Sequence, residues 1–452
     1  MSTSTRARGR FLAPFALLGL LVSSVLTGAR PATPAHSPVT LTVWWANWGV
    51  DFDNLMVQAT DSHSVWHKLH PDITVKWTFY QNLQQKLLTA IAAGSPPDMT
   101  YINALQGQAW AQKGVLTPLD NYFKAAHLEK RQFVPASFPP YEYNGHLYAL
   151  LNSGNFLAIL WNKDLFKAAG LPNHAPRTIQ EVEAYNAKLF KFKNGRIIQA
   201  GLFADLPPGG LPLQTWGLQF GGDFVDRAHH KITANDPHIV AALEWMLKQS
   251  KKYGQANEDR FYSTLGSAST PQDPFYKGKI AMEWQGDWDF YTQAKYAPKM
   301  HVGVAALPTA GHGLRLWDDN NWATAIPKGS AHANEAWQLM QYLTTGPQAP
   351  KVIADTINFL EYKPLVPAFF KETYRIMGPK NPMRQDFHVF QDTIMPHTVA
   401  QPYYDIPVSS VYDQELGRAV DNVLHGKDTP KHALDVVTQR VQHAWDTFSP
   451  SS

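Results

Sequence analysis

The sequence predicts an α/β fold, in which strands alternate with helices and the helices connect the strands of a sheet by crossovers. Residues 73–79 alternate strictly between apolar and polar side chains, as in a strand buried on one face. Residues 83–91 then repeat leucine and isoleucine at helical spacing, and Gly94 suits the end of that helix. A short strand at 98–102 follows, so strand, helix and strand succeed one another directly.

The segment Leu41 to Gly49 is predicted to begin as the first strand and then to turn. Alternation places Trp45 on one face of the strand and Trp44 on the other, and it makes Trp45 the core candidate. Asn47 and Trp48 lie beyond the strand. Tryptophan rings at the end of a strand can line a cleft and stack on the flat face of a ligand. The alternative is that these tryptophans only form part of the core.

The alternation of elements continues through the chain. We expect a helix over residues 53–70, because Pro71 disfavours a helical conformation at the residue before it. Asp236 is expected to cap the N-terminus of another helix, and Pro237 is expected to be its first residue. Further strands are expected at 156–161, 279–284, 301–305 and 322–326, and further helices at 164–169, 335–343, 409–424 and 430–448.

The composition restricts the possible functions. Lys and Arg total 40 and Asp and Glu 37, and three of the arginines lie at positions 6, 8 and 10, so the remaining chain is balanced in charge. No basic run with interleaved aromatics suggests nucleic acid. The absence of cysteine excludes disulfides, thiolate metal sites and cysteine nucleophiles. The 15 tryptophans could serve stacking on sugars or form a large aromatic core.

The N-terminus has the pattern of an export signal. The three arginines precede an apolar run at 11–26, and small residues at 27–29 allow cleavage. We therefore expect a signal peptide at 1–29 and a tether at 30–39. Residues 25–28 resemble the bacterial lipoprotein box, but Ala29 stands where the lipidated cysteine would be. Release of the protein and retention by an uncleaved signal segment both stay open.

Several motifs, in a consistent order from about residue 40 to 445, resemble the extracellular solute-binding proteins of bacterial sugar ABC importers (family 1, similar to maltose-binding protein). Each motif is weak alone, whereas the ordered set is specific to the family but not to one sugar. The motifs are Leu41 to Gly49, Trp66 to Ile73, Gly94 to Asp98, Leu160 to Phe166, Ala169 to Pro172, Phe275 to Gly286 and Val302 to Pro308.

The resemblance implies a two-lobe α/β fold of the periplasmic-binding-protein type II, in which lobes joined by crossing hinge segments close over a ligand. It places the N-lobe at 38–153 and 312–362, the C-lobe at 156–308 and 366–452, and the hinges near 151–156, 307–317 and 361–367.

The resemblance also implies a function. The chain would be the exported substrate-binding component of an ABC importer, capturing a sugar, with an oligosaccharide favoured, and delivering it to the transmembrane subunits of a permease. It would be periplasmic or extracellular at the outer face of the cytoplasmic membrane. It would be a monomer without enzymatic activity, cofactor, metal or nucleic-acid partner.

A sugar binder needs aromatic platforms for the C–H faces of the ligand and amides or carboxylates for its hydroxyls. We expect Trp48 and Trp288 to be the platforms. In maltose-binding proteins the positions after the 98–102 strand are charged, so the amides here put the same sugar in doubt. Core packing is the alternative for Trp216, and a helix cap is the alternative for Asp287. The expected ligand-binding residues are Trp44, Asn47, Trp48, Asn103, Gln106, Asn155, Trp216, Trp284, Asp287, Trp288, Asn321, Trp322 and Tyr412.

Two rival functions are disfavoured. A secreted glycoside hydrolase would need paired carboxylates, for which Asp98, Asp287 and Asp319 are available, but no motif pairs them. No H-E-x-x-H, G-x-S-x-G or Walker motif occurs. The same fold could bind a non-sugar solute such as a polyamine, which would need a cage of carboxylates. Asp318 and Asp319 could also bind a cation such as calcium, although their spacing is not that of an EF-hand.

Overall fold

A computed structural model describes residues 37–134, 137–154, 156–205, 211–268, 270–317, 322–356, 359–399 and 402–448, without the side chains of residues 50, 51, 211 and 317. The predicted signal peptide, most of the predicted tether, Asn155, Asn321 and the Asp318-Asp319 pair lie outside these ranges. Residues 38–452 form one compact unit. Within the described ranges, no helix combines the length and apolarity needed to cross a membrane.

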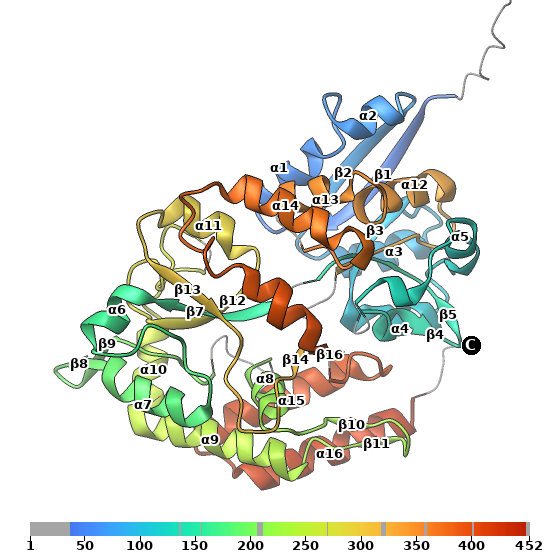
Figure 1. The fold of residues 1–452 in the computed structure, drawn as a ribbon. Coiled ribbons are helices and arrows are strands. Elements are labelled where there is room, and N and C mark those ends of the chain that lie inside the picture. The colour runs from blue at the N-terminus through green and yellow to red at the C-terminus, as the bar shows by residue number, and fades with distance from the viewer. Residues whose placement is uncertain are drawn as a thin grey trace, which may run out of the picture. The chain divides into compact units, whose positions relative to one another are not determined.

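The first sheet has five strands in the order β2-β1-β3-β15-β6 (Figure 1). Its strands are β1 (Val39–Ala46), β2 (Ile73–Tyr80), β3 (Met99–Asn103), β6 (Leu150–Ser153) and β15 (Trp322–Ala325). β1 pairs in parallel with β2 and β3, whereas β15 is antiparallel to β3 and β6. The carboxyl ends of β1, β2, β3 and β6 and the first residue of β15 therefore meet at one edge of the sheet.

The predicted strand–helix–strand succession is confirmed in this first sheet. β1 buries Leu41, Val43 and Trp45, the three residues that alternation places on one face. The crossover helices are α3 (Leu83–Ala92) after β2 and α4 (Ala104–Gln112) after β3.

The predicted single helix over 53–70 is wrong. The structure has two short helices there, α1 (Val50–Gln58) and α2 (Val65–Leu69). The polar segment between them favours a turn, because Asp61 Oδ1 accepts a hydrogen bond from His63 N at 2.8 Å and Ser64 Oγ accepts one from His67 N at 3.1 Å. The cap at Ser64 starts a new helix where the apolar spacing suggested a continuous one.

The second sheet has three antiparallel strands in the order β12-β7-β13. They are β7 (Leu157–Asn162), β12 (Met282–Gly286) and β13 (Val302–Ala305), so the predicted strand at 279–284 begins and ends later than expected. β7 lies in the middle and is buried along almost its whole length. Gly303 is required beside it, since a Cβ at that position would lie 2.2 Å from the ring of Trp161.

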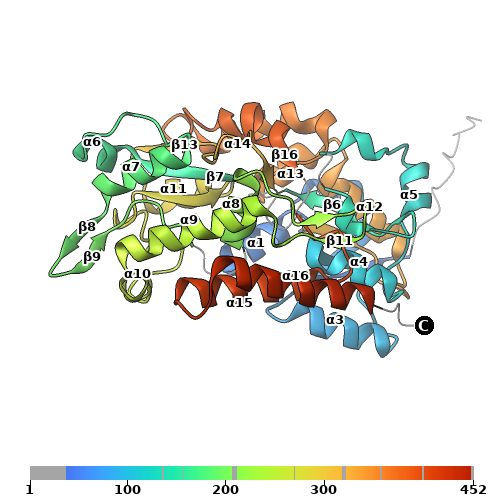
Figure 2. The same cartoon turned by 90° about the horizontal axis from the view of Figure 1, so that it is seen from below.

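Most remaining helices surround the two sheets (Figures 1 and 2). α15 and α16 pack on one another and on α9 (Figure 2). The predicted cap at Asp236 is confirmed, because its Oδ1 accepts from His238 N at 2.8 Å. The helices are α5 (Asp120–Ala125), α6 (Lys163–Ala168), α7 (Ile179–Leu189), α8 (Leu211–Gln219), α9 (Pro237–Tyr253), α10 (Gln255–Tyr262), α11 (Asp289–Tyr296), α12 (Ala333–Thr344), α13 (Ala349–Asp355), α14 (Val366–Met377), α15 (Ser409–Leu424) and α16 (Pro430–Asp446).

Four two-stranded ribbons are also found among the described residues. None of their strands was predicted, because each has only two to four residues. They are β4 (Glu142–Tyr143) with β5 (His146–Leu147), β8 (Lys191–Lys193) with β9 (Arg196–Gln199), β10 (Val225–Asp226) with β11 (Lys231–Ile232), and β14 (Leu316–Trp317) with β16 (Thr398–Val399).

The chain passes between the two sheets more than once. It leaves the first sheet after β6 and enters the second at β7, with only residues 154–156 between them. It returns between β13 and β15. Gly154 N donates to Phe359 O at 3.0 Å, and the rings of Phe156 and Phe359 are 4.6 Å apart, so the first passage packs against a later segment of the chain.

Asp98 ties the start of β3 to two other segments. Its Oδ2 accepts from Thr42 N at 2.8 Å and from Thr42 Oγ1 at 2.7 Å, and its Oδ1 accepts from His332 N at 3.2 Å and from Ser330 Oγ at 3.3 Å. Burial raises the pKa of the Asp98 carboxyl, but the hydrogen bonds from Thr42 and the charge of His332 outweigh it and lower the pKa below its usual value. The carboxylate is therefore a structural acceptor.

We predict that Asp98→Ala lowers the free energy of unfolding by roughly 2–4 kcal/mol at pH 7, because it leaves buried donors without an acceptor. Since the folded-state pKa is lowered, this contribution is present at neutral pH and is lost as the pH falls below about 4. Urea unfolding at pH 7 and pH 3 measures both effects. His332→Ala is the control and should cost less. An equal loss for Asp98→Ala at the two pH values would contradict the assignment.

Candidate ligand-binding site

The first aromatic wall consists of Trp48, Tyr101, Asn103 and Trp322. The rings of Trp48 and Trp322 stack with centroids 3.6 Å apart and planes 20° apart, and both stand nearly perpendicular to Tyr101. Trp48 follows the end of β1 and Trp322 begins the antiparallel strand β15, so both lie at the edge where the parallel strands end. Each of the stacked rings has one face covered by the other, and both side chains are only partly buried.

Trp45 lies behind this wall. It is fully buried, with Trp48 5.8 Å and Trp77 5.6 Å from its ring, so the prediction that it belongs to the core is confirmed. Trp44 points to the other face of the sheet, where it packs edge-on against Tyr80 at 5.0 Å. A ligand contact by Trp44 would therefore lie apart from the Trp48–Trp322 stack.

Asn47 is engaged on both sides of its amide. Its Nδ2 donates to Asp53 Oδ2 at 2.9 Å, and its Oδ1 accepts from Gln81 Nε2 at 2.9 Å. Asp53 Oδ1 also accepts from Trp48 N at 3.3 Å. These bonds give Asn47 a structural role in holding the turn that carries Trp48.

Asn103 and Gln106, the two amide side chains at the end of β3, have different roles. Gln106 is buried, and its Oε1 accepts from Asn103 N at 3.1 Å, so it caps α4 rather than facing solvent. Asn103 pairs with Trp322 across the ladder between β3 and β15. Asn103 and Gln106 have the arrangement of a capping box, in which the Asn103 side chain faces the backbone N–H of Gln106. The Oδ1 of Asn103 is buried, and no hydrogen bond of ordinary geometry reaches it from the described residues. That oxygen is an acceptor beside the aromatic stack that a ligand hydroxyl could satisfy.

The second aromatic wall consists of Trp284, Asp287 and Trp288, at the end of β12 and before α11. The ring of Trp288 lies on Gly286, where a Cβ would come within 1.9 Å of it, so a larger residue there would displace the ring. Trp284 packs edge-on against Trp216 at 5.1 Å, and its buried Nε1 has no partner in the described part of the chain. Both wall tryptophans are partly exposed.

Asp287 connects the second wall to the passage between the sheets. It is 2% exposed, and its Oδ1 accepts from Phe156 N at 3.1 Å. Burial raises the pKa of Asp287 to about 8, and the bond from Phe156 offsets only part of this effect. The carboxyl therefore holds its proton at neutral pH and positions the segment after residue 154.

The strand pairings bring the backbone of the first wall close to the backbone of the second. Trp322 pairs with Ser153 at the end of β6, and Gly286 pairs with Leu157 at the start of β7. Ser153 and Leu157 are four residues apart, which limits their separation to about 14 Å even in a fully extended chain. The tryptophans of the two walls therefore flank the same short passage.

Two of the expected ligand residues are core residues, and direct ligand contact is not supported at either. Trp216 is fully buried, its Nε1 donates to Ala204 O at 2.8 Å, and its ring packs against Trp245. Tyr412 is fully buried, its hydroxyl donates to Phe224 O at 2.8 Å, and it stacks on Tyr403 at 4.1 Å. Sequence alone cannot distinguish such buried aromatics from exposed ones.

Tyr101 is the wall residue that the sequence analysis missed. It lies on β3 one position before Ile102, and its ring stands against both Trp48 and Trp322. The available signal was an aromatic side chain near the end of a strand adjacent to β1. Without the strand order, that position could not be linked to Trp48.

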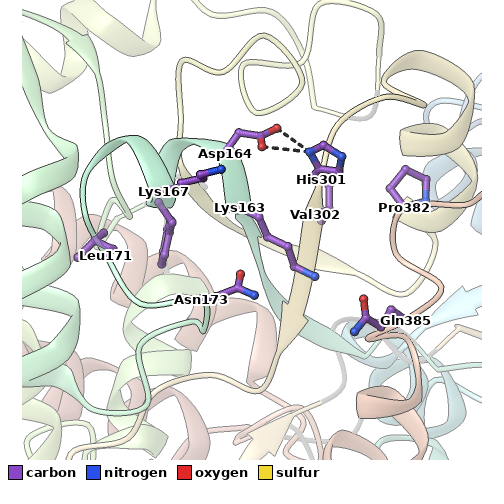
Figure 3. A pocket seen from close by; sticks show the side chains of 10 residues that line it. Lys163, Asp164, Lys167, Leu171, Asn173, His301, Val302, Pro382 and Gln385 are labelled. Atoms are coloured by element: carbon purple, nitrogen blue, oxygen red, sulfur yellow. Dashed lines mark hydrogen bonds and ion pairs between the residues drawn. The ribbon is translucent and has the colours of Figure 1, made fainter.

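Two pockets in the described part of the chain lie elsewhere, and none of the expected ligand residues lines them. One of 490 Å³ is found where β7 ends and β13 begins, lined by Lys163, Lys167 and His301 among others (Figure 3). There His301 Nδ1 lies 3.0 Å from Asp164, and Lys163 is paired with Asp386 at 2.8 Å. The other, of 820 Å³, is lined by α1, α2, α12 and α13 and also by Tyr291 of α11 and Ile376 of α14. Within the described ranges, no group of three or more His, Asp or Glu side chains could hold a metal ion.

Comparison with known proteins gives related sequences. The chain is 26% identical over 410 residues to the sn-glycerol-3-phosphate-binding periplasmic protein UgpB of Pectobacterium atrosepticum, covering 83% of this chain and 85% of the relative. It is 22% identical over 295 residues to a maltotriose-binding protein of Pyrococcus abyssi, covering 64% of this chain and 60% of the relative. These relatives are binding proteins.

Solved structures confirm the two-lobe periplasmic-binding-protein-like fold. CpMnBP1 with mannotriose bound has a TM-score of 0.72 at 25% identity and covers 89% of this chain and 100% of its own. A solute-binding protein of Thermotoga lettingae bound with α-D-tagatose has a TM-score of 0.72 at 22% identity, covering 89% and 99%. A family model described as bacterial extracellular solute-binding protein matches residues 46–349. The chain therefore belongs to the bacterial extracellular solute-binding protein family.

Proposed function

We propose that this protein is the substrate-binding component of an ABC importer and that it captures a carbohydrate, with an oligosaccharide favoured, between the two aromatic walls. The observation that carries this proposal is the placement of both walls at one short passage, between Ser153 and Leu157. The ligand would be delivered to the transmembrane subunits of a permease. The protein would act as a monomer, exported by its signal peptide to the outer face of the cytoplasmic membrane.

The chemistry of the walls favours a neutral polyol. Indole faces stack on the C–H faces of a sugar ring, and the buried Oδ1 of Asn103 offers an acceptor for a hydroxyl. Neither wall contains a lysine or arginine for a phosphate, although several relatives bind glycerol 3-phosphate by name. Asp287, the one wall carboxyl, is buried and accepts from Phe156 N, so the walls offer no exposed carboxylate for a cationic ligand such as a polyamine.

The proposed mechanism is closure of two lobes. The N-lobe comprises 38–153 and 312–362, the C-lobe 156–308 and 366–452, and the hinges lie near 151–156, 307–317 and 361–367. Support comes from the five-stranded sheet, which lies entirely in the proposed N-lobe, and from the three-stranded sheet, which lies in the C-lobe. A ligand that contacts both walls binds the closed state better and shifts the population toward it.

The role is binding without catalysis. Of the carboxylates considered for a hydrolase, Asp98 is bound to Thr42, Ser330 and His332, and Asp287 is bound to Phe156 N. Asp319 lies outside the described residues. Both described candidates are thus structural acceptors, whereas glycoside hydrolysis needs a pair of carboxyl groups that face the substrate.

Calorimetric titration against a panel of monosaccharides, oligosaccharides, glycerol 3-phosphate and polyamines tests the ligand class. We expect a neutral sugar to bind and the charged solutes to show no heat of binding. Binding of glycerol 3-phosphate or of a polyamine, with no sugar bound, would overturn the proposal. Release of reducing ends from a bound oligosaccharide would overturn its non-enzymatic part.

We predict that Trp48→Ala, Trp322→Ala and Trp288→Ala each weaken binding of the preferred sugar by about tenfold or more, because each removes a stacking face worth about 1–1.5 kcal/mol. Titration calorimetry measures the change. Trp445→Ala is the matched control, since this half-buried tryptophan packs on His230 and belongs to neither wall. Unchanged affinity in both Trp48→Ala and Trp288→Ala would refute the site.

We predict a pH signature at Asp287. Because its folded-state pKa lies near 8, above the usual value near 4, unfolding releases a proton in that window and the free energy of unfolding falls as the pH rises. Asp287→Asn keeps an acceptor for Phe156 N and removes this dependence. Urea unfolding measures the free energy of unfolding of both proteins. The difference between the value for the parent and the value for Asp287→Asn should change by up to about 1.4 kcal/mol per pH unit between pH 5 and 8. Asp392→Asn, at an exposed position, should follow the parent.

A further inference from the structure

The β8–β9 ribbon exposes apolar and basic side chains together. It lies at the outer edge of the group formed by α6, α7 and α10 in both views (Figures 1 and 2). Phe192 is 47% exposed and Ile198 49% exposed, which places them among the few large apolar side chains of the described residues that face solvent. Arg196 and Ile198 point outward on β9, whereas Ile197 and Gln199 are buried.

The charge of the ribbon has one sign. Lys191, Lys193 and Arg196 are exposed, and no ion pair is found for them among the described residues. No aspartate or glutamate occurs between Lys188 and Ala204. Lys193 pairs with Arg196 and Phe192 with Ile197, so Lys193, Arg196 and Ile198 lie on one face of the ribbon and Phe192 on the other. The ribbon therefore presents uncompensated positive charge, on a chain whose Lys and Arg, the ribbon's three included, balance its acids once Arg6, Arg8 and Arg10 are set aside.

The ribbon is held firmly in place. Asn194 and Gly195 both have positive φ, of 52° and 72°, as the two central residues of a tight hairpin turn require. Asn257 of α10 accepts from Ile197 N at 3.3 Å and donates through Nδ2 to Gly195 O at 3.0 Å. Ile197 also packs in a small core with Phe190 and other aromatics. The exposed side chains are thus presented on a fixed scaffold.

We propose that the β8–β9 ribbon is a contact surface for anionic phospholipid headgroups. Lysine and arginine near a negatively charged membrane are attracted to it, and an aromatic and an aliphatic side chain beside them can enter the interfacial region. Because Phe192 and Ile198 lie on opposite faces of the ribbon, a fluid surface that surrounds its end contacts both side chains, whereas an acidic protein would cover one face. Such a contact would hold the binding protein reversibly beside the membrane.

Co-sedimentation of the full chain with vesicles tests this proposal. We expect binding to vesicles of phosphatidylglycerol and phosphatidylcholine, little binding to phosphatidylcholine alone, and loss of binding in 0.5 M salt. The triple variant Lys191→Glu, Lys193→Glu, Arg196→Glu should weaken partitioning by roughly a hundredfold or more. Phe192→Ser with Ile198→Ser should weaken it about tenfold while keeping the salt dependence.

The matched control is the triple variant Lys113→Glu, Lys371→Glu, Lys380→Glu, which changes the net charge equally at exposed positions outside the ribbon. It should bind vesicles nearly as the parent does, and thermal unfolding confirms that each variant is folded. An equal loss in the control would show that only net charge matters and would overturn the proposal. Absence of parent binding to anionic vesicles would also overturn it, and binding to immobilised polyglutamate instead would point to an acidic protein partner.

Discussion

Insertion of β15 between β3 and β6 is the pairing on which the rest of the structure depends. It joins a strand from residues 322–325 to a sheet that otherwise comes from the first third of the chain. The register of this insertion places Trp322 beside Asn103 and Ser153 and brings its ring against Trp48. The aromatic stack, the unpaired amide oxygen and the end of β6 are neighbours because the backbone ladder makes them so.

Buried carboxyl groups are the second feature that constrains the structure, and they are concentrated in the second half of the chain. Burial raises the pKa of Glu258 to about 9 and that of Asp289 to about 7, and it also raises the pKa of Glu283. Asp289 accepts hydrogen bonds from Tyr276 and Thr292 at the start of α11, directly after Trp288. Burial thus favours the neutral form of these carboxyl groups, while the hydrogen bonds from Tyr276 and Thr292 oppose this effect at Asp289.

The sequence predicted the local part of this architecture well. Alternation correctly placed Trp45 in the core, and the Asp236-Pro237 pair correctly started a helix, because both depend on neighbours in the chain. The helix at 53–70 was predicted wrongly because the turn depends on the side-chain bonds of Asp61 and Ser64. Tyr101 was not singled out, and the burial of Trp216 and Tyr412 could not be foreseen, because their surroundings come from pairings and packing between distant segments. Periodicity carries no information about such contacts.

The position of β15 late in the sequence has a consequence for how the protein folds during synthesis and export. Thr117 Oγ1 donates to Pro327 O just after β15, and these residues are 210 apart, so the first sheet cannot be completed until most of the chain has been made. Long-range pairings of this kind slow folding, since the entropy of closing a large loop is lost before the contacts form. An exported chain benefits from this delay, because a polypeptide that has not yet closed its sheet can still be threaded through a secretion channel.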